Sequence, residues 1–326
     1  MRAPLCFGII SDIQYADIEP ASNFGGSEHR EYRGSAQAAH SALDDMFKCA
    51  SQVSFIAQLG DLVDGQNAGE YGQGLALSAP QSESAINQTL RIWDKYNTVV
   101  YHTIGNHELY NFTWDRLQEH LNGQRGECHH HLFSPNAYGS FSPQPGWKAI
   151  VLNSYELNVI KPRDEETRAF TEDLLTRMNP NYGQTPPFNF FEGLSKERLR
   201  YVPFNGGFGR SQLEWVTDEL KEAALADEKC LIFSHLPIYA PAASEKNVAF
   251  DADELLERLG EYEEQVSAYF AGHRHSGGAA VDAFGIPHIT VQSPLTHGKC
   301  AAIVRVDEVS LRIEGIGAHR SYEFKI

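Results

Sequence analysis

The stretch from Phe7 to Gln14 constrains the fold more than any other part of the sequence. Residues 5–10 form a short, continuous apolar run, which predicts a buried strand. The run is followed at once by a carboxylate, Asp12, and two residues later by a neutral amide, Gln14. A carboxylate just past the end of a core strand costs free energy unless something binds it. We therefore expect this strand end to bind a ligand.

Four later stretches repeat this pattern of a strand followed by polar side chains. We predict these strands over residues 53–59, 99–104, 230–233 and 266–270, and they lead into Gly60-Asp61, Gly105-Asn106-His107, Ser234-His235 and Gly272-His273-Arg274-His275. Apolar residues at helical spacing predict helices over 35–50 and 82–96. Alternating strands and helices predict a mainly parallel sheet with helices on its faces. The carboxyl ends of such strands lie together, at the edge where α/β sheets bind ligands.

The second half of the chain continues with further strands and a long insertion. We predict strands over 147–153, 287–292, 301–306 and 310–315, and helices over 212–226 and from about 252 to 259. Residues 154–210 are rich in proline, glycine and aromatic residues and form the insertion, with one helix near 165–178. We treat residues 1–326 as a single domain.

Local signals suggest helix starts and one loop. Ser35 is a plausible N-cap, and Ser211 with Glu214 has the spacing of a capping box. Asp251, with Glu254, is predicted to cap the next helix. The run His129-His130-His131 lies in a polar, glycine-rich neighbourhood, and we interpret it as a solvated loop rather than a metal site.

The candidate metal ligands share one position, just past a predicted strand. They are Asp12, Gln14, Asp61, Asn106, His235, His273 and His275. Hard oxygen donors mixed with imidazoles suit Mn(II), Mg(II), Fe or Zn, and the lack of cysteine disfavours a structural zinc site. The number of donors matches two ions that share one carboxylate. The sequence therefore predicts a dinuclear metal centre.

The order of these motifs resembles the calcineurin-like metallophosphoesterase superfamily. The matching blocks are Asp-x-Gln, Gly-Asp-x-x-Asp, Gly-Asn-His-Glu, Ser-His-Leu-Pro and Gly-His-x-His, between residues 12 and 275. Gln14 stands where that superfamily usually has histidine. This departure, with Phe204-Asn205-Gly206-Gly207-Phe208, resembles one branch, the manganese-dependent ADP-ribose/CDP-alcohol diphosphatases. The resemblance implies an α/β fold, a four-layer α/β/β/α sandwich with two mixed sheets.

The resemblance also implies residue roles. The first ion would take Asp12, Gln14, Asp61 and His275, and the second Asp61, Asn106, His235 and His273. His107 would face the substrate as the catalytic residue, and Asp64 would orient a ligand from outside the coordination sphere; the alternative for Asp64 is a loop cap. An amide oxygen at Gln14 favours Mn(II), with Mg(II) as the other possibility, because both prefer oxygen ligands.

The implied activity is hydrolysis of a pyrophosphate bond by a metal-bridging hydroxide. ADP-ribose would give AMP and ribose 5-phosphate, and CDP-alcohols would give CMP and a phosphoalcohol. Four residues are candidates for substrate contacts: Phe24, Arg33, Leu194 and Asn205. Arg33 could equally be a surface arginine, and Phe24 could pack internally. The alternatives are a cyclic nucleotide or general phosphodiesterase, and a non-catalytic binding scaffold; the presence of His107 argues against the scaffold.

Composition narrows the partners. The net charge is −16, with 43 acidic and 27 basic residues, so we expect no nucleic-acid partner. No apolar run approaches the roughly 18 residues of a membrane span, so we expect no membrane partner. The five cysteines are scattered and form no CxxC motif, which favours buried thiols in a reducing compartment. We expect a cytoplasmic monomer acting on small nucleoside diphosphate compounds.

Overall fold

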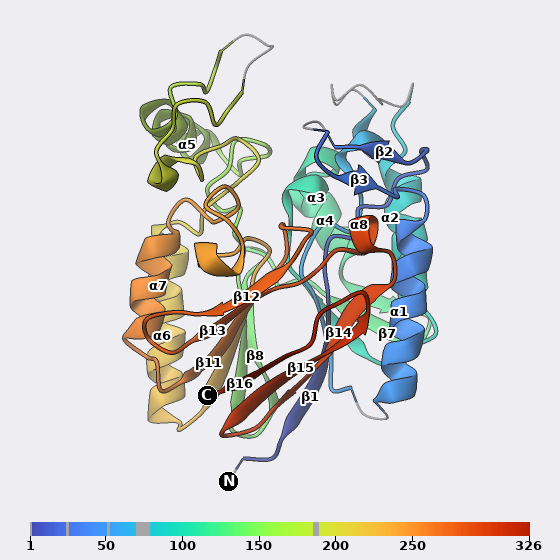
Figure 1. The fold of residues 1–326 in the computed structure, drawn as a ribbon, viewed down its shortest axis with the longest axis vertical. Helices are drawn as coiled ribbons and strands as arrows, with labels where there is room; N and C mark the ends of the chain where they lie inside the picture. Colours follow the sequence, from blue (N-terminus) through green and yellow to red (C-terminus); the bar gives the residue numbers. More distant parts are fainter. Residues whose placement is uncertain (1, 24–25, 51–52, 70–78, 185–188) are drawn as a thin grey trace.

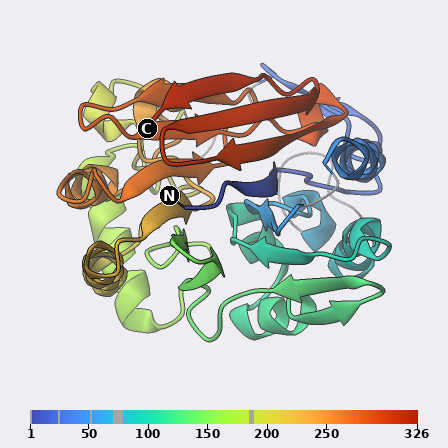
Figure 2. The ribbon, with the colours of Figure 1, turned by 90° about the horizontal axis from the view of Figure 1, so that it is seen from below.

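Two mixed β-sheets pack face to face, with helices on both outer faces (Figures 1 and 2). The computed structural model describes residues 2–23, 26–50, 53–69, 79–184 and 189–326. The sheet order is β16-β15-β14-β1-β4-β5-β7-β6 in one layer and β12-β13-β11-β10-β9-β8 in the other. The predicted four-layer α/β/β/α sandwich is confirmed.

The larger sheet consists of β1 (Leu5–Ile10), β4 (Ile56–Gln58), β5 (Val99–His102), β6 (Gly123–Arg125), β7 (Cys128–His131), β14 (Cys300–Val306), β15 (Ser310–Gly317) and β16 (Tyr322–Lys325). The smaller sheet consists of β8 (Gly139–Gln144), β9 (Trp147–Val151), β10 (Lys229–Phe233), β11 (Val266–Ala271), β12 (Gly278–Val281) and β13 (Pro287–Thr290). A separate hairpin pairs β2 (Ala21–Ser22) with β3 (His29–Arg30).

Helices α1 (Ser35–Cys49), α2 (Ser82–Leu90), α3 (Asn106–Asn111), α4 (Trp114–His120) and α8 (Pro294–His297) lie on the side of the larger sheet (Figure 1). Helices α6 (Arg210–Leu225) and α7 (Ala252–Gly260) cover the smaller sheet, and α5 (Glu165–Met178) lies beyond their upper ends. Within the described ranges, no helix has the length and apolar character needed to span a membrane.

The core between the sheets is built from alternate residues of β1. Leu5, Phe7 and Ile9 are fully buried there, and the Phe7 ring meets Phe233 and Phe270 edge to face at 5.6 and 5.7 Å between centroids. Burying a phenylalanine side chain contributes about 1.5–3 kcal/mol. The free energy gained by burying three such rings is therefore comparable with much of a domain's net stability of about 5–15 kcal/mol. This packing fixes the two sheets relative to each other.

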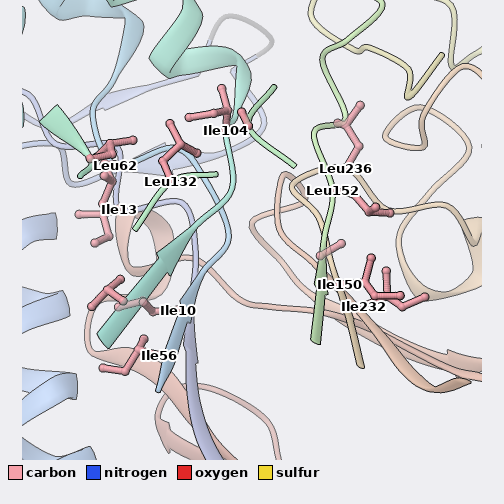
Figure 3. Close-up of a cluster of buried hydrophobic side chains, with 14 of the residues drawn as sticks. Ile10, Ile13, Ile56, Leu62, Ile104, Leu132, Ile150, Leu152, Ile232 and Leu236 are labelled. Carbon is pink, nitrogen blue, oxygen red and sulfur yellow. The ribbon is translucent and has the colours of Figure 1, made fainter. Parts of the chain in front are cut away.

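Parallel pairing brings the predicted ligand loops to one end of the molecule. In the larger sheet, β1 pairs in parallel with β4, and β4 with β5. In the smaller sheet, β10 pairs in parallel with β9 and β11. A second apolar cluster continues up to these strand ends, with Ile10, Leu62 and Ile104 on one side and Leu152 and Leu236 on the other (Figure 3).

The predicted helix caps were wrong in detail. Helix α1 begins at Ser35 with Gly34 as N-cap, and the Ser35 hydroxyl donates to the carbonyl of Tyr32. Helix α6 begins at Arg210, before the predicted Ser211. Just before this helix, the Asp251 carboxylate accepts from the backbone N–H groups of Phe208 and of Gly209, the N-cap residue. Asp251 therefore does not cap its own helix α7 through its side chain.

The histidine run was also misread as a solvated loop. Residues 128–131 form strand β7, which pairs in parallel with β5. His130 is fully buried and its Nδ1 lies 2.9 Å from Nε2 of His102, whose Nδ1 lies 3.0 Å from Gln58 Oε1. Burial lowers the pKa of His130 to about 4, so the ring is neutral and hydrogen-bonded rather than solvated. The polar composition of this segment favoured a loop, whereas it forms a strand in which Cys128 and His130 are buried.

Candidate metal centre

The predicted ligands come together where five strands end. Asp12 and Gln14 follow β1, Asp61 follows β4, Asn106 follows β5, and three histidines follow β10 and β11: His235, His273 and His275. Asp61, His235 and His273 each offer one potential ligand atom, and these three atoms all lie within 4.8 Å of one another. A second contact joins Asp12 Oδ1 to His275 Nε2 at 3.6 Å. The site therefore bridges both sheets.

Hydrogen bonds define which nitrogen of each histidine faces the centre. His235 donates from Nδ1 to the carbonyl of Leu59 at 2.7 Å, which leaves the lone pair of Nε2 free. His273 donates from Nε2 to Asn205 Oδ1 at 2.9 Å, because the Asn205 amide nitrogen already donates to two backbone carbonyls. The lone pair of His273 Nδ1 then lies 3.2 Å from His235 Nε2, which in turn lies 3.5 Å from Asp61 Oδ2.

These donors fit a divalent cation. Two imidazole lone pairs and a carboxylate oxygen face one another at distances where they repel unless a cation lies among them. Burial lowers the pKa of both His235 and His273, so both rings are neutral, as metal ligands must be. Gln14 adds a further sign: its Oε1 is buried without a hydrogen-bond partner, while its Nε2 contacts Asp61 Oδ2 and His275 Nε2, each at 3.0 Å. Turning this amide would present an oxygen donor to the centre.

The backbone is strained at four of these residues. Six described residues other than glycine have positive φ angles, and four of them are predicted ligands: Asp12, Gln14, Asp61 and His273, with φ angles of 53°, 43°, 58° and 66°. Residues held in this left-handed region each cost of order 1–3 kcal/mol and cluster at functional sites. The glycine before a ligand is also required sterically: a Cβ at Gly272 would lie 1.9 Å from Ser11 Oγ.

Asp61 is the most crowded ligand. Its Oδ1 accepts from the backbone N–H of His107 at 2.9 Å, and the residue is fully buried. Burial, followed by the negative charges of Glu108 and Asp12, raises the pKa of Asp61 well above its ordinary value. A carboxylate placed among other carboxylates in the interior needs a positive partner, which supports a role as the shared ligand.

Glu108 anchors the loop that carries Asp61, a role that its motif did not reveal. Its carboxylate accepts from three buried backbone N–H groups, those of Asp61, Leu62 and Gly105. Burial raises the pKa of Glu108 to about 7, although the hydrogen bonds from these N–H groups lower it. The same side chain thus ties the end of β4 to the end of β5.

Replacing Glu108 with alanine is expected to lower the free energy of unfolding by several kcal/mol. Each buried N–H group left without an acceptor costs about 1–3 kcal/mol, and three are affected. Urea unfolding of the metal-free protein would measure the loss, and Glu108→Gln, which keeps an acceptor oxygen, should lose less. The exposed Glu257 provides the control, because Glu257→Ala should stay within about 0.5 kcal/mol of wild type. Equal stability of Glu108→Ala and wild type would contradict this reading.

His107 borders the centre and keeps a proton for an incoming group. The backbone N–H of Gly65 donates to its Nδ1 at 2.8 Å, so the proton of the neutral ring resides on Nε2. Burial, followed by the positive charge of Arg30, lowers the pKa of His107 well below its usual value. Asp64 Oδ2 lies 3.3 Å from the same Nδ1, and Asp64 also caps a 3₁₀ turn through Gln66 N–H. Asp64 thus contacts His107 and caps a turn at the same time.

The predicted substrate residues are placed differently from one another. Phe24 lies outside the described residues. Arg33 is exposed and bound to two carboxylates, Asp17 and Glu19. Leu194 is half-buried in the insertion. Asn205 is fully buried; its amide nitrogen donates to the carbonyls of Arg200 and Lys246, and its Oδ1 accepts from His273.

Two charged residues on the β2–β3 hairpin reach the centre and were missed. Glu28 Oε2 accepts from His275 Nδ1 at 2.8 Å and from Arg30 Nε at 3.1 Å. Arg30 is mostly buried, and its positive charge acts on Asp64 and His107. No sequence pattern pointed to them, because the loop from 15 to 34 has no regular periodicity. Tyr155 was missed as well; its hydroxyl lies 3.2 Å from Asn106 Oδ1.

This fold and the donor arrangement define a class of dinuclear metal hydrolases, and the chain belongs to the calcineurin-like phosphoesterase family, whose model matches residues 7–277. It is similar to proteins named manganese-dependent ADP-ribose/CDP-alcohol diphosphatase. The mouse protein is 34% identical over 88% of this chain and 82% of its own length, and the zebrafish (Danio rerio) protein is 33% identical over 95% of both. A crystal structure of a dimetal phosphatase from Danio rerio superposes with a TM-score of 0.83, at 29% identity over 98% of both chains.

Proposed function

We propose that this protein hydrolyses the pyrophosphate bond of small nucleoside diphosphate compounds, ADP-ribose and CDP-alcohols, with two Mn(II) ions. The observation that carries the proposal is the buried group of neutral histidines and carboxylates at the strand ends, with Asp61 between the two sheets. Relatives that align over most of their length are named for this activity, which supports the substrate class. When bound, the two ions supply Lewis acidity and activate water.

We assign the seven predicted residues to these ions. Asp61 is the ligand that both ions share. The first ion would also take Asp12, Gln14 and His275. The second ion would also take Asn106, His235 and His273. His235 and His273 offer the nitrogen that their hydrogen bonds leave free, Nε2 and Nδ1 respectively. The first ion would have three oxygen donors and the second would have two, and this oxygen-rich set favours Mn(II) or Mg(II) over zinc.

The remaining polar groups suit a diphosphate. His107 presents its Nε2–H and can donate a hydrogen bond to a phosphoryl or leaving-group oxygen. Arg30 is a better candidate than Arg33 for binding the second phosphate of the substrate. The positive charge of Arg30 acts on His107, beside the metal centre, whereas Arg33 is exposed and forms ion pairs with Asp17 and Glu19. Leu194 and Phe24 stay proposed contacts for the base or ribose. We further propose that the protein acts as a cytoplasmic monomer; five unpaired cysteines support the reducing compartment.

The test is a product assay on the purified protein with the metals varied. With Mn(II), ADP-ribose should give AMP and ribose 5-phosphate, and CDP-choline should give CMP and phosphocholine. Mg(II) should support less activity, and a chelator should abolish it. Cyclic AMP and bis-p-nitrophenyl phosphate are the comparison substrates, because a general phosphodiesterase would prefer them. Activity confined to monoesters, or indifferent to Mn(II), would contradict the proposal.

A further inference from the structure

Glu28 occupies a position that connects the β2–β3 hairpin to the metal centre. The hairpin is held by its own turn, in which Asn23 Oδ1 accepts from the backbone of Ser27 and Glu28. At the far end of the hairpin, the backbone N–H of Glu31 donates to the carbonyl of Leu295 in α8. The carboxylate of Glu28 is thereby carried to His275, which is distant in sequence and almost fully buried.

Two independent contacts define the tautomer of His275. Its Nδ1 lies 2.8 Å from Glu28 Oε2, and because an ionised carboxylate only accepts, the Nδ1 must carry the proton. Its Nε2 lies 3.0 Å from Gln14 Nε2 and 3.6 Å from Asp12 Oδ1, so the lone pair points toward the proposed ligands. A carboxylate that accepts from one ring nitrogen orients the other nitrogen and makes it a stronger donor.

Glu28 makes a second contact on the same oxygen. Arg30 Nε donates to Glu28 Oε2 at 3.1 Å, so one carboxylate holds both a proposed metal ligand and the cation assigned to the substrate. Both neighbours donate to this oxygen, and the Arg30 guanidinium is positively charged, so the ionised form of the carboxylate is favoured.

We propose that Glu28 is a positioning residue that orients His275 for one metal ion and holds Arg30 beside it. This proposal rests on the proposed dinuclear metal site. Loss of the Glu28 carboxylate frees the His275 ring to rotate or change tautomer. The affinity for the ion that His275 binds is then lowered, and the ligands of the other ion are unchanged.

The experiment measures Mn(II) binding to metal-free protein, with free Mn(II) followed by its electron paramagnetic resonance signal. Wild type should bind two equivalents. Glu28→Ala should bind one of them about 10–100-fold more weakly and the other with unchanged affinity. Glu28→Gln, whose amide oxygen can still accept from Nδ1–H, should give a smaller loss. The ¹⁵N resonances of His275 should show the Nδ1–H tautomer in wild type and a mixture in Glu28→Ala.

Two variants serve as controls. Glu31 follows the same hairpin, is about half exposed and pairs with His29, so Glu31→Ala should bind both equivalents as wild type does. Arg30→Ala removes a positive charge from the site, so it should not weaken Mn(II) binding if Glu28 acts directly on His275. Thermal unfolding checks that each variant is folded.

The outcomes separate the two proposals. Unchanged affinity for both equivalents in folded Glu28→Ala overturns the role of Glu28, as does an equal loss in Glu31→Ala. Wild-type protein that fails to bind two equivalents overturns the dinuclear site itself, whatever the variants do.

Discussion

The Asp61→Asn variant is expected to lose both Mn(II) binding and hydrolysis. Asparagine has nearly the same size, and its oxygen can still accept from His107 N–H, but it brings no charge to a site where Asp61 is the proposed shared ligand. The loss of activity should exceed about 100-fold, which is the upper end of the loss seen when a residue that only supports a metal ligand is replaced. Product assays and Mn(II) titration measure it, and near-normal binding of two equivalents would contradict the shared-ligand assignment.

The same substitution is expected to stabilise the metal-free protein. The folded pKa of Asp61 lies well above its unfolded value because of burial and of the charges of Glu108 and Asp12. An acid whose folded pKa is raised makes stability fall as pH rises from the unfolded pKa toward the folded one. Asp61→Asn removes this fall, so its advantage in thermal unfolding should be present at neutral pH and shrink as pH is lowered. A lower unfolding temperature than wild type at pH 7, measured in chelator, would contradict this.

The His107→Ala variant is expected to lower kcat by about 100–1,000-fold, the usual cost of removing one hydrogen-bond donor to a developing charge. Mn(II) binding should stay unchanged, because His107 is not among the proposed ligands. His107→Gln keeps an N–H donor and should retain more activity than alanine. The exposed His29 gives the matched control, and His29→Gln should behave as wild type.

The pH profile provides a second check on His107. Because its pKa lies well below 6.5, the ring stays neutral between pH 6 and 8 and keeps its Nε2–H throughout. The wild-type rate should therefore show no loss through titration of His107 in this range. A loss of Mn(II) binding in His107→Ala would instead make His107 a ligand.

The strand ends could be predicted from sequence because the signal there is local. A short apolar run that stops at a carboxylate or histidine, as at Ile10 and Asp12, identifies both the strand and the polar group that needs a partner. The structure brings those groups together because the parallel register of β1, β4 and β5 aligns their ends. The strand-end pattern was thus sufficient to select the proposed ligands, whereas the packing of two sheets around them was implied by the family resemblance.

Features that depend on distant contacts could not be predicted. The backbone N–H groups that precede helix α6, those of Phe208 and Gly209, donate to Asp251, more than forty residues later in the chain. Glu28 and Arg30 acquire their roles only because the hairpin packs against α8 and reaches His275. His130 looked polar in sequence, yet it is buried, with its Nδ1 paired to His102 on the neighbouring strand. Propensity carries no information about such partners.

The left-handed backbone at Asp12, Gln14, Asp61 and His273 has a consequence for how ions are acquired. The conformational cost of these residues is met when the polypeptide folds, before any ion arrives. An incoming cation meets donors whose backbone is already ordered, so little chain entropy is left to lose, although the side-chain amide of Gln14 has to turn. Loading should therefore be limited by dehydration of the ion rather than by rearrangement of the polypeptide, and exchange among divalent ions of similar radius should leave the scaffold unchanged.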